Sequence, residues 1–172
     1  MLRQKGYSLI EAIACLLLAS VLALNAIPAM QEMLNRSEAQ SAANLMLIRV
    51  QQARSLAAQR GRIIAICSGV EQCTGQNTWQ RSLLLFEDEN GNGQRESDER
   101  IVRQEMLPER HRWFWSSFRR KPYLQLQPDG STLALNGTLT LCQTGQPTFQ
   151  LIIGLGGRPR IRDAPQQLSV CH

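Results

Sequence analysis

The feature that most constrains this chain is a charge-free apolar run near its N-terminus, over residues 12–30. A helix rises about 1.5 Å per residue, so this run is long enough to cross the roughly 30 Å hydrocarbon core of a bilayer. Arg3 and Lys5 precede the run, and the positive-inside rule therefore places the N-terminus in the cytoplasm. A secretory signal peptide fits less well, because the run is too long and no A-x-A-like cleavage site closes it.

A single carboxylate, Glu11, stands at the start of this run. An unpaired carboxylate inside a membrane costs roughly 2.5–3.5 kcal/mol on insertion scales. Glu11 therefore either lies at the membrane interface or is held for a specific partner.

Residues 6–11, with the sequence GYSLIE, resemble the class III leader of type IV pilins and type II secretion pseudopilins. In that family a prepilin peptidase cuts after the glycine and methylates the new N-terminus. The resemblance implies that cleavage follows Gly6 and that Tyr7, in place of the usual Phe, is the first mature residue. Glu11 is then the fifth mature residue, where the family has a glutamate that pairs with the N-terminal amine of a neighbouring subunit.

The resemblance and the hydropathy pattern divide the chain into three parts. We expect a leader peptide over residues 1–6, a transmembrane and filament-core helix over 7–33, and a globular pilin-like domain over 34–172. A helix over about 8–60, bent at Pro28 and stopped by Gly61, joins the last two. Its second half has an apolar stripe at three- and four-residue steps, which comprises Ala39, Ala42, Met46, Val50, Ala53 and Ala57.

After Gly61 the pattern changes to short β-like runs separated by Asn-Gly and Asp-Gly turns. The runs cover residues 63–67, 79–86, 101–106, 123–126, 137–142 and 148–153. Strands after one long helix predict an α+β domain with a mostly antiparallel sheet. We expect residues 110–121 to form a mobile loop.

Composition argues against catalysis. The chain has only two histidines, His111 and His172, and no nucleotide-binding or HExxH motif. A histidine metal site or a Ser-His-Asp hydrolase is therefore hard to build. Of the 19 basic residues all but Lys5 and Lys121 are arginine, and the net charge is +5. An arginine-rich chain favours an anionic polymer as partner.

Five cysteines fit an exported domain. Cys15 lies in the apolar run, and the other four allow three pairings. We favour Cys67–Cys73, a short staple, and Cys142–Cys171, which would hold the C-terminus. A Cys₄ zinc site is the alternative, but the cysteines lack C-x₂₋₄-C spacing.

Residues 88–99 match the EF-hand calcium loop, with glycine sixth and glutamate twelfth. Strand-like segments flank the loop where an EF-hand needs helices, and pilins of the FimT/GspH-like family often carry a similar loop. The pattern therefore predicts the tip of a β-hairpin. A weak calcium site is the alternative, with oxygen ligands from Asp88, Asn90, Asn92 and Glu99.

Two segments concentrate positive charge. Residues 110–121 hold five Lys or Arg and four aromatic residues but no acid. Charges that track phosphates and flat rings that stack on bases suit a nucleic-acid surface. Alternatively, the rings of Trp113, Trp115 and Phe118 belong to the core.

The second segment contains Arg158, Arg160 and Arg162, which alternate and so share one face if the segment is extended. An ordinary basic edge strand is the alternative reading. However, the sequence GRPR at residues 157–160 resembles the GRxR motif of the FimT subgroup. In that subgroup the motif belongs to a DNA-binding surface used in natural transformation.

Together these resemblances imply a minor pilin of the FimT/GspH-like family, closest to the FimT subgroup. The implied partners are prepilin peptidase, the inner membrane, other pilin subunits and double-stranded DNA, and no cofactor or catalytic residue is implied. The globular domain would be periplasmic and then part of an extracellular pilus. The implied DNA contacts are Arg158, Arg160, Arg162, Arg119, Arg120 and Lys121. The alternative is a minor pilin or GspH-like pseudopilin that primes or caps filament assembly without binding DNA.

Overall fold

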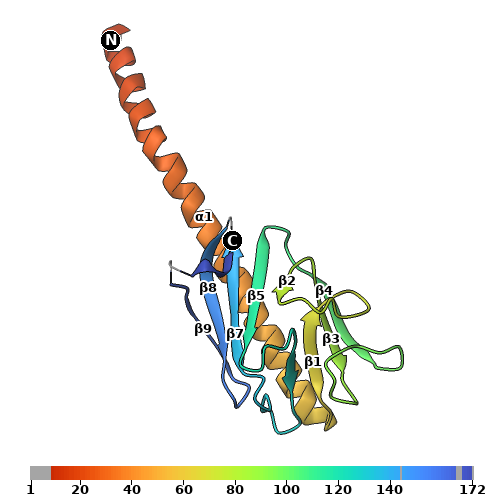
Figure 1. Cartoon of the computed structure of the whole chain (residues 1–172). Helices are drawn as coiled ribbons and strands as arrows, with labels where there is room; N and C mark the ends of the chain where they lie inside the picture. Colours follow the sequence, from red (N-terminus) through yellow and green to blue (C-terminus); the bar gives the residue numbers. More distant parts are fainter. Residues whose placement is uncertain (1–8, 144, 166–167, 172) are drawn as a thin grey trace, which may run out of the picture. The chain divides into compact units, whose positions relative to one another are not determined.

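A computed structural model of the chain describes residues 9–143, 145–165 and 168–171 (Figure 1). The chain divides into two compact units, residues 1–38 and 39–172. The expected leader over residues 1–6 and the cleavage point between Gly6 and Tyr7 lie outside the described residues.

One helix, α1 (Leu9–Arg60), continues through Pro28. Glu11 lies in its first turn with an exposed side chain. Large apolar side chains are exposed along the part of α1 in the first unit: Leu9, Ile10, Ile13, Leu16, Leu17, Leu18, Leu24, Ile27, Met30, Met33 and Leu34. Among the described residues, no helix combines the length and mean hydropathy of a candidate membrane span. The membrane-spanning helix expected over residues 7–33 is therefore not confirmed.

In the second unit α1 buries a stripe of mostly small side chains. The buried residues are Ala39, Ala43, Met46, Val50, Ala53 and Ala57. Five of these six belong to the stripe that the sequence predicts, and Ala42 is partly buried beside Ala43. Gly61, at φ +65°, follows the last helical residue in the left-handed conformation typical of a helix C-terminus.

In the described residues after α1, the chain forms nine strands and a short 3₁₀ helix. One sheet has the order β4-β3-β1-β6 and contains β1 (Ile64–Ser68), β3 (Ser82–Glu87), β4 (Ile101–Met106) and β6 (Leu124–Leu126). The other has the order β2-β5-β7-β8-β9 and contains β2 (Thr78–Trp79), β5 (His111–Ser117), β7 (Gly137–Gln143), β8 (Gln146–Ile153) and β9 (Pro159–Asp163). The 3₁₀ helix is η1 (Ser169–Cys171). Every strand pair is antiparallel, so the predicted α+β class is confirmed.

The second unit carries its own core. The main hydrophobic cluster joins the stripe of α1 to side chains of both sheets, including Ile64, Leu85, Trp113 and Leu141. A second cluster comprises Ala65, Cys67, Leu84, Phe86, Tyr123 and Leu135. Successive side chains of β1 and β3 alternate between the two clusters, which is why both strands read as continuous apolar runs. Because both clusters lie entirely within residues 39–172, this unit can fold by itself.

Two disulfides complete the second unit, Cys67–Cys73 and Cys142–Cys171. This is the pairing that the sequence favoured, and no cysteine of the set is left over for zinc. Cys15 is a free, exposed thiol.

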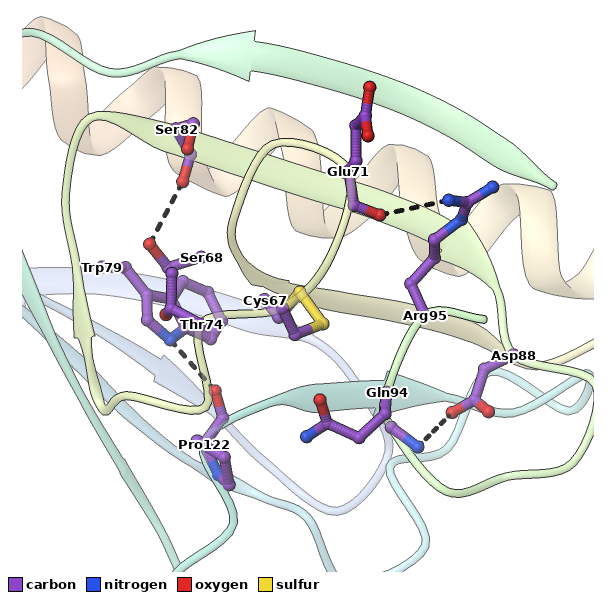
Figure 2. Close-up of a disulfide and its surroundings, with 12 residues drawn as sticks. Cys67, Ser68, Glu71, Thr74, Trp79, Ser82, Asp88, Gln94, Arg95 and Pro122 are labelled. Atoms are coloured by element: carbon purple, nitrogen blue, oxygen red, sulfur yellow. Dashed lines mark hydrogen bonds between the residues drawn. A yellow bond between two sulfur atoms is a disulfide. The ribbon is translucent and has the colours of Figure 1, made fainter. Parts of the chain in front are cut away.

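The expectation of a mobile loop over residues 110–121 is wrong for residues 111–117. They form β5, which is paired on both sides by β2 and β7. The rings of Trp113 and Trp115 are 1% and 2% exposed and belong to the core. The Trp115 Nε1–H donates to the Tyr123 carbonyl at 3.0 Å. The Trp79 Nε1–H donates similarly to the Pro122 carbonyl at 3.1 Å (Figure 2).

The apolar run expected over residues 79–86 is also divided. Trp79 ends β2 in one sheet, whereas Ser82 begins β3 in the other. Arg81, at φ +65°, turns the chain between them.

Candidate nucleic-acid interface

The arginines of the C-terminal segment lie along β9, the edge strand of the five-stranded sheet (Figure 1). Arg160 and Arg162 alternate with the partly buried Pro159 and Ile161, and both arginines are exposed. Arg158 precedes the strand and is exposed too. The alternation predicted for these three residues therefore holds over the part that is a strand.

Gly157 fixes the backbone position of Arg158. Its φ is +67°, and a Cβ added there would lie 2.1 Å from the Gly130 carbonyl oxygen. The Gly157 N–H donates to the Gly154 carbonyl at 2.9 Å, which closes a turn before β9. A left-handed backbone packed against another backbone segment leaves room only for glycine.

Arg162 is held more firmly than its neighbours. Its Nε and Nη2 donate to Gln150 Oε1 at 2.9 and 2.7 Å. Gln150 Nε2 donates in turn to Thr140 Oγ1 at 3.1 Å, so a polar chain crosses β9, β8 and β7. Arg162 therefore serves partly to order this face of the sheet, although the residue is exposed.

Three more cations occupy the turn after β5. Arg119, Arg120 and Lys121 are all exposed, and Phe118 is 78% exposed. The Ser117 hydroxyl donates to the Lys121 carbonyl at 3.0 Å and accepts the Lys121 N–H at 2.9 Å, which closes the turn. Phe118 is thus the most exposed aromatic residue of the segment 110–121, since Phe114 is half-buried and Trp113 and Trp115 are core residues.

The strand register brings these two groups of cations to one end of the five-stranded sheet. Ser117 lies opposite Gly137, Gly137 opposite Ile153, and Ile153 opposite Pro159. Three strand spacings of about 4.8 Å separate the end of β5 from the start of β9, or about 14 Å. We call this group the basic patch and define it as Arg119, Arg120, Lys121, Arg158, Arg160 and Arg162.

The basic patch differs from other arginines of the chain in lacking acidic partners. Arg49 pairs with Glu105, Arg60 with Glu87, and Arg62 with Glu89. Within the described part of the chain, no carboxylate forms an ion pair with any member of the basic patch. Its positive charge is therefore available to an external anion.

The loop over residues 88–99 lies elsewhere, at the tip of the β3–β4 hairpin in the other sheet. Asp88 and Glu99 are buried, at 0% and 3% exposure, whereas Asn90 and Asn92 are exposed. Within the described ranges, no group of three or more His, Cys, Asp or Glu side chains is placed to hold a metal. The pairing of β3 with β4 makes the loop the tip of a hairpin, as the flanking strand patterns predicted.

The sequence analysis identified the charged residues of the basic patch but missed the residues that position them. Ser117 and Gln150 are ordinary polar residues, and nothing local marks them as contacts of Lys121 and Arg162. The approach of Gly157 to Gly130 is also a tertiary contact. The Gly156-Gly157 pair before the arginines was the one available signal of a tight turn.

Three comparisons place this geometry among known proteins. A model of the family described as type II transport protein GspH matches residues 42–157. A search of curated proteins gives no match. Among solved structures, the type IV minor pilin FimU of Pseudomonas aeruginosa is 22% identical, with a TM-score of 0.54 over 77% of this chain and 92% of that one.

The minor pseudopilin EpsH from the type II secretion system of Vibrio cholerae has the same TM-score, 0.54, at 15% identity. The match covers 77% of this chain and 98% of EpsH. At these identities the two structures establish the shared fold, a long N-terminal helix on antiparallel sheets. The family match covers most of the domain that contains both sheets. The chain therefore belongs to the GspH family.

Proposed function

We propose that this minor pilin captures DNA on the surface of a pilus, through phosphate contacts made by the basic patch. The observation that carries the proposal is a group of exposed cations without acidic partners, gathered at one end of a sheet. Contacts of this kind read no base sequence, which suits the uptake of arbitrary DNA. The resemblance of residues 157–160 to the GRxR motif supports the same role.

The spacing within the basic patch suits a duplex. The end of β5 and the start of β9, which adjoin the two groups of cations, are about 14 Å apart, close to the roughly 12 Å width of the DNA major groove. One group can contact phosphates on each side of a groove. Phe118 adds an exposed ring that can stack on an unpaired base at a strand end.

The N-terminal segment supplies the second half of the proposal, which is placement of the domain on a filament. The exposed apolar side chains between Leu9 and Leu34 need an apolar surrounding, first the inner membrane and then neighbouring pilin helices. Prepilin peptidase would cut between Gly6 and Tyr7. The new amine of one subunit would then pair with the Glu11 carboxylate of the next.

The direct experiment is a DNA-binding assay on residues 35–172. The unit from Ala39 onward carries its own core, so this fragment is suited to the assay. We expect Arg158→Gln combined with Arg160→Gln to weaken binding to all duplex sequences alike. A matched control is Arg100→Gln combined with Arg103→Gln, which removes the same charge from exposed arginines on or beside β4. If both double variants lost the same amount of DNA affinity, binding would depend on the net charge of the domain and not on the basic patch.

The second candidate is a minor pilin or pseudopilin that primes or caps filament assembly and binds no DNA. It is favoured by the family match, whose description refers to type II transport. Under this candidate the fragment fails to bind duplex DNA at low salt, while Glu11 remains necessary for assembly.

A further inference from the structure

We propose that the loop over residues 88–99 binds one calcium ion, at the tip of the β3–β4 hairpin. The ligands would be oxygens of Asp88, Asn90, Asn92, the Gln94 carbonyl and Glu99. This site is independent of the basic patch and of DNA binding. The sequence analysis preferred a hairpin tip and kept a calcium site as the alternative, whereas we propose that the loop is both. The two are compatible, because β3 and β4 flank the loop and the proposed ligands lie between the strands.

The first argument is the fold of the loop around its first residue. Asp88 Oδ2 accepts the N–H of Gly93 at 2.9 Å and a hydrogen bond from Gln125 Nε2. The carboxylate thus reaches across the loop to the sixth position. In Figure 2 the Asp88 side chain points inward, toward the backbone beside Gln94.

The second and decisive argument is an unsatisfied charge. Asp88 is 0% exposed, yet its Oδ1 has no hydrogen-bond partner in the described part of the chain. Buried carboxylates are normally paired with a cation or coordinate a metal. Neither Asp88 nor the buried Glu99 forms an ion pair with a Lys or Arg of the described residues. A divalent cation would neutralise both carboxylates.

Arg95, the arginine within the loop, is directed toward main-chain carbonyls. Arg95 donates to main-chain carbonyls, from Nη1 to Glu71 at 3.2 Å and from Nε to Glu99 at 3.2 Å. Figure 2 shows Arg95 reaching the Glu71 carbonyl, which lies in the segment closed by the Cys67–Cys73 disulfide. Arg95 therefore braces the loop against the disulfide segment, with no contact to the Asp88 carboxylate.

The side chains of the other proposed ligands accept main-chain N–H groups of the same loop. Asn90 Oδ1 and Asn92 Oδ1 accept the N–H groups of Asn92 and Gln94, at 2.9 and 2.6 Å. The Glu99 carboxylate accepts the N–H groups of Glu89 and Glu96, at 3.0 and 2.9 Å. Each of these oxygens keeps a second lone pair for a metal.

The sixth position of the loop requires glycine for its backbone conformation and also for the space beside it. Gly93 has φ +72°, and a Cβ added there would lie 2.2 Å from the Tyr123 ring. The Tyr123 ring therefore packs against the inner side of the loop.

Calcium fits this donor set better than magnesium. Two carboxylates, two amide oxygens and one carbonyl are an oxygen-only set of irregular geometry, which calcium accepts, whereas magnesium demands a near-ideal octahedron. Two acidic ligands predict a weak site, with a Kd of about 10⁻⁴–10⁻³ M as in extracellular modules. That range suits a domain held outside the cytoplasm.

The test uses residues 35–172 from which metal ions have been removed with a chelator. This fragment is titrated with CaCl₂, and separately with MgCl₂, in a calorimeter. We expect one calcium per chain, a rise in the thermal unfolding midpoint on adding calcium, and magnesium binding at least about tenfold weaker. The variant Asn90→Ala with Asn92→Ala removes two exposed ligands and spares the buried carboxylates. It should bind calcium at least about tenfold more weakly.

The matched control is Asp98→Ala, which removes an exposed acid of the same loop that is at no ligand position. It should bind within about threefold of the parent, because an exposed charge is screened by salt. The proposal is overturned by the absence of both heat and midpoint shift up to about 10 mM calcium. It is equally overturned if the Asn90/Asn92 variant binds calcium as the parent does.

Discussion

Single residues with no charge determine where the cations of the basic patch stand. Gly157 accepts a close approach to the Gly130 carbonyl and so sets the start of β9. The Ser117 hydroxyl closes the turn that presents Arg119, Arg120 and Lys121. At this scale, the backbone conformation at these uncharged residues determines where the charged side chains lie.

Replacement of Gly157 tests that view. Gly157→Ala forces an L-residue into a left-handed conformation and places its Cβ against a backbone oxygen, so we expect a loss of about 2 kcal/mol or more in unfolding free energy. The control is Gly156→Ala, since a Cβ there meets nothing within 4 Å, and its effect should stay within about 0.5 kcal/mol. Urea unfolding of residues 35–172 measures both, and equal stability of the two variants would contradict the close approach.

Tyr123 provides a residue-scale test by titration. Burial raises the pKa of the Tyr123 phenol above its ordinary value of 10.0, and the negative charge of Asp88 adds to this effect. The stabilisation from the neutral phenol is complete below pH 10.0 and is lost as the pH rises through the folded-state pKa. The only other tyrosine is Tyr7, so phenolate absorbance of residues 35–172 reports Tyr123 alone. The folded fragment should titrate above the urea-unfolded one, and coincident curves would contradict the burial.

At the scale of elements, the sequence predicted some strands far better than others. The run at 101–106 matches β4, and the run at 137–142, where apolar and polar residues alternate, matches all but the last residue of β7. β5 was missed because the segment 110–121 was read as one arginine-rich stretch, although most of its basic residues lie just before or after the strand. The spacing of Trp113 and Trp115, two residues apart with polar or half-buried neighbours, was the local signal of a strand with one buried face.

The break between β2 and β3 could not be predicted in the same way. Trp79 and Leu83 both belong to the main cluster but come from different sheets. The backbone turn at Arg81 that separates them has no glycine or asparagine to mark it. Such a turn is stabilised by tertiary packing on both sides, which a local pattern does not contain.

The two disulfides should contribute unequally to stability. Cys142–Cys171 spans a sequence separation of 29 and Cys67–Cys73 one of 6. The chain-entropy model gives about 3.6 kcal/mol for the longer loop and about 2.4 kcal/mol for the shorter. Paired Cys→Ala variants of residues 35–172, compared by urea unfolding, should follow that order. A larger loss from Cys67→Ala with Cys73→Ala would contradict the chain-entropy ranking.

The start of α1 carries the prediction on processing and assembly. Intact mass of the membrane-extracted protein should show loss of residues 1–6 and one added methyl group. Glu11→Ala should be processed but enter sheared filaments poorly, because the amine of the neighbouring subunit loses its carboxylate partner. Glu32→Ala, which removes another exposed acid of the same helix, should assemble as the parent does. A mature chain that begins at Met1, or normal incorporation of Glu11→Ala, would refute this account.

At the scale of the whole molecule, the chain divides into two units with different surfaces. The described part of residues 1–38 belongs to α1 and has exposed apolar side chains, whereas residues 39–172 contain both sheets, both disulfides and their own core. From composition, the sequence analysis expected a globular domain from residue 34 onward. The sequence also identified the charged residues of the basic patch. It could not predict that they lie at one end of the sheet, because this depends on the pairing of β5, β7, β8 and β9.

The salt dependence of DNA binding tests the central claim most directly. If the basic patch neutralises about four phosphates of duplex DNA, log K should fall with log salt concentration with a slope near −3.6, from an affinity that is micromolar or weaker at physiological salt. Arg158→Gln with Arg160→Gln should flatten the slope to about −1.8, because two phosphate contacts are lost. A double variant with the slope and affinity of the parent would show that the basic patch is only a solvated edge, and that the domain serves filament assembly alone.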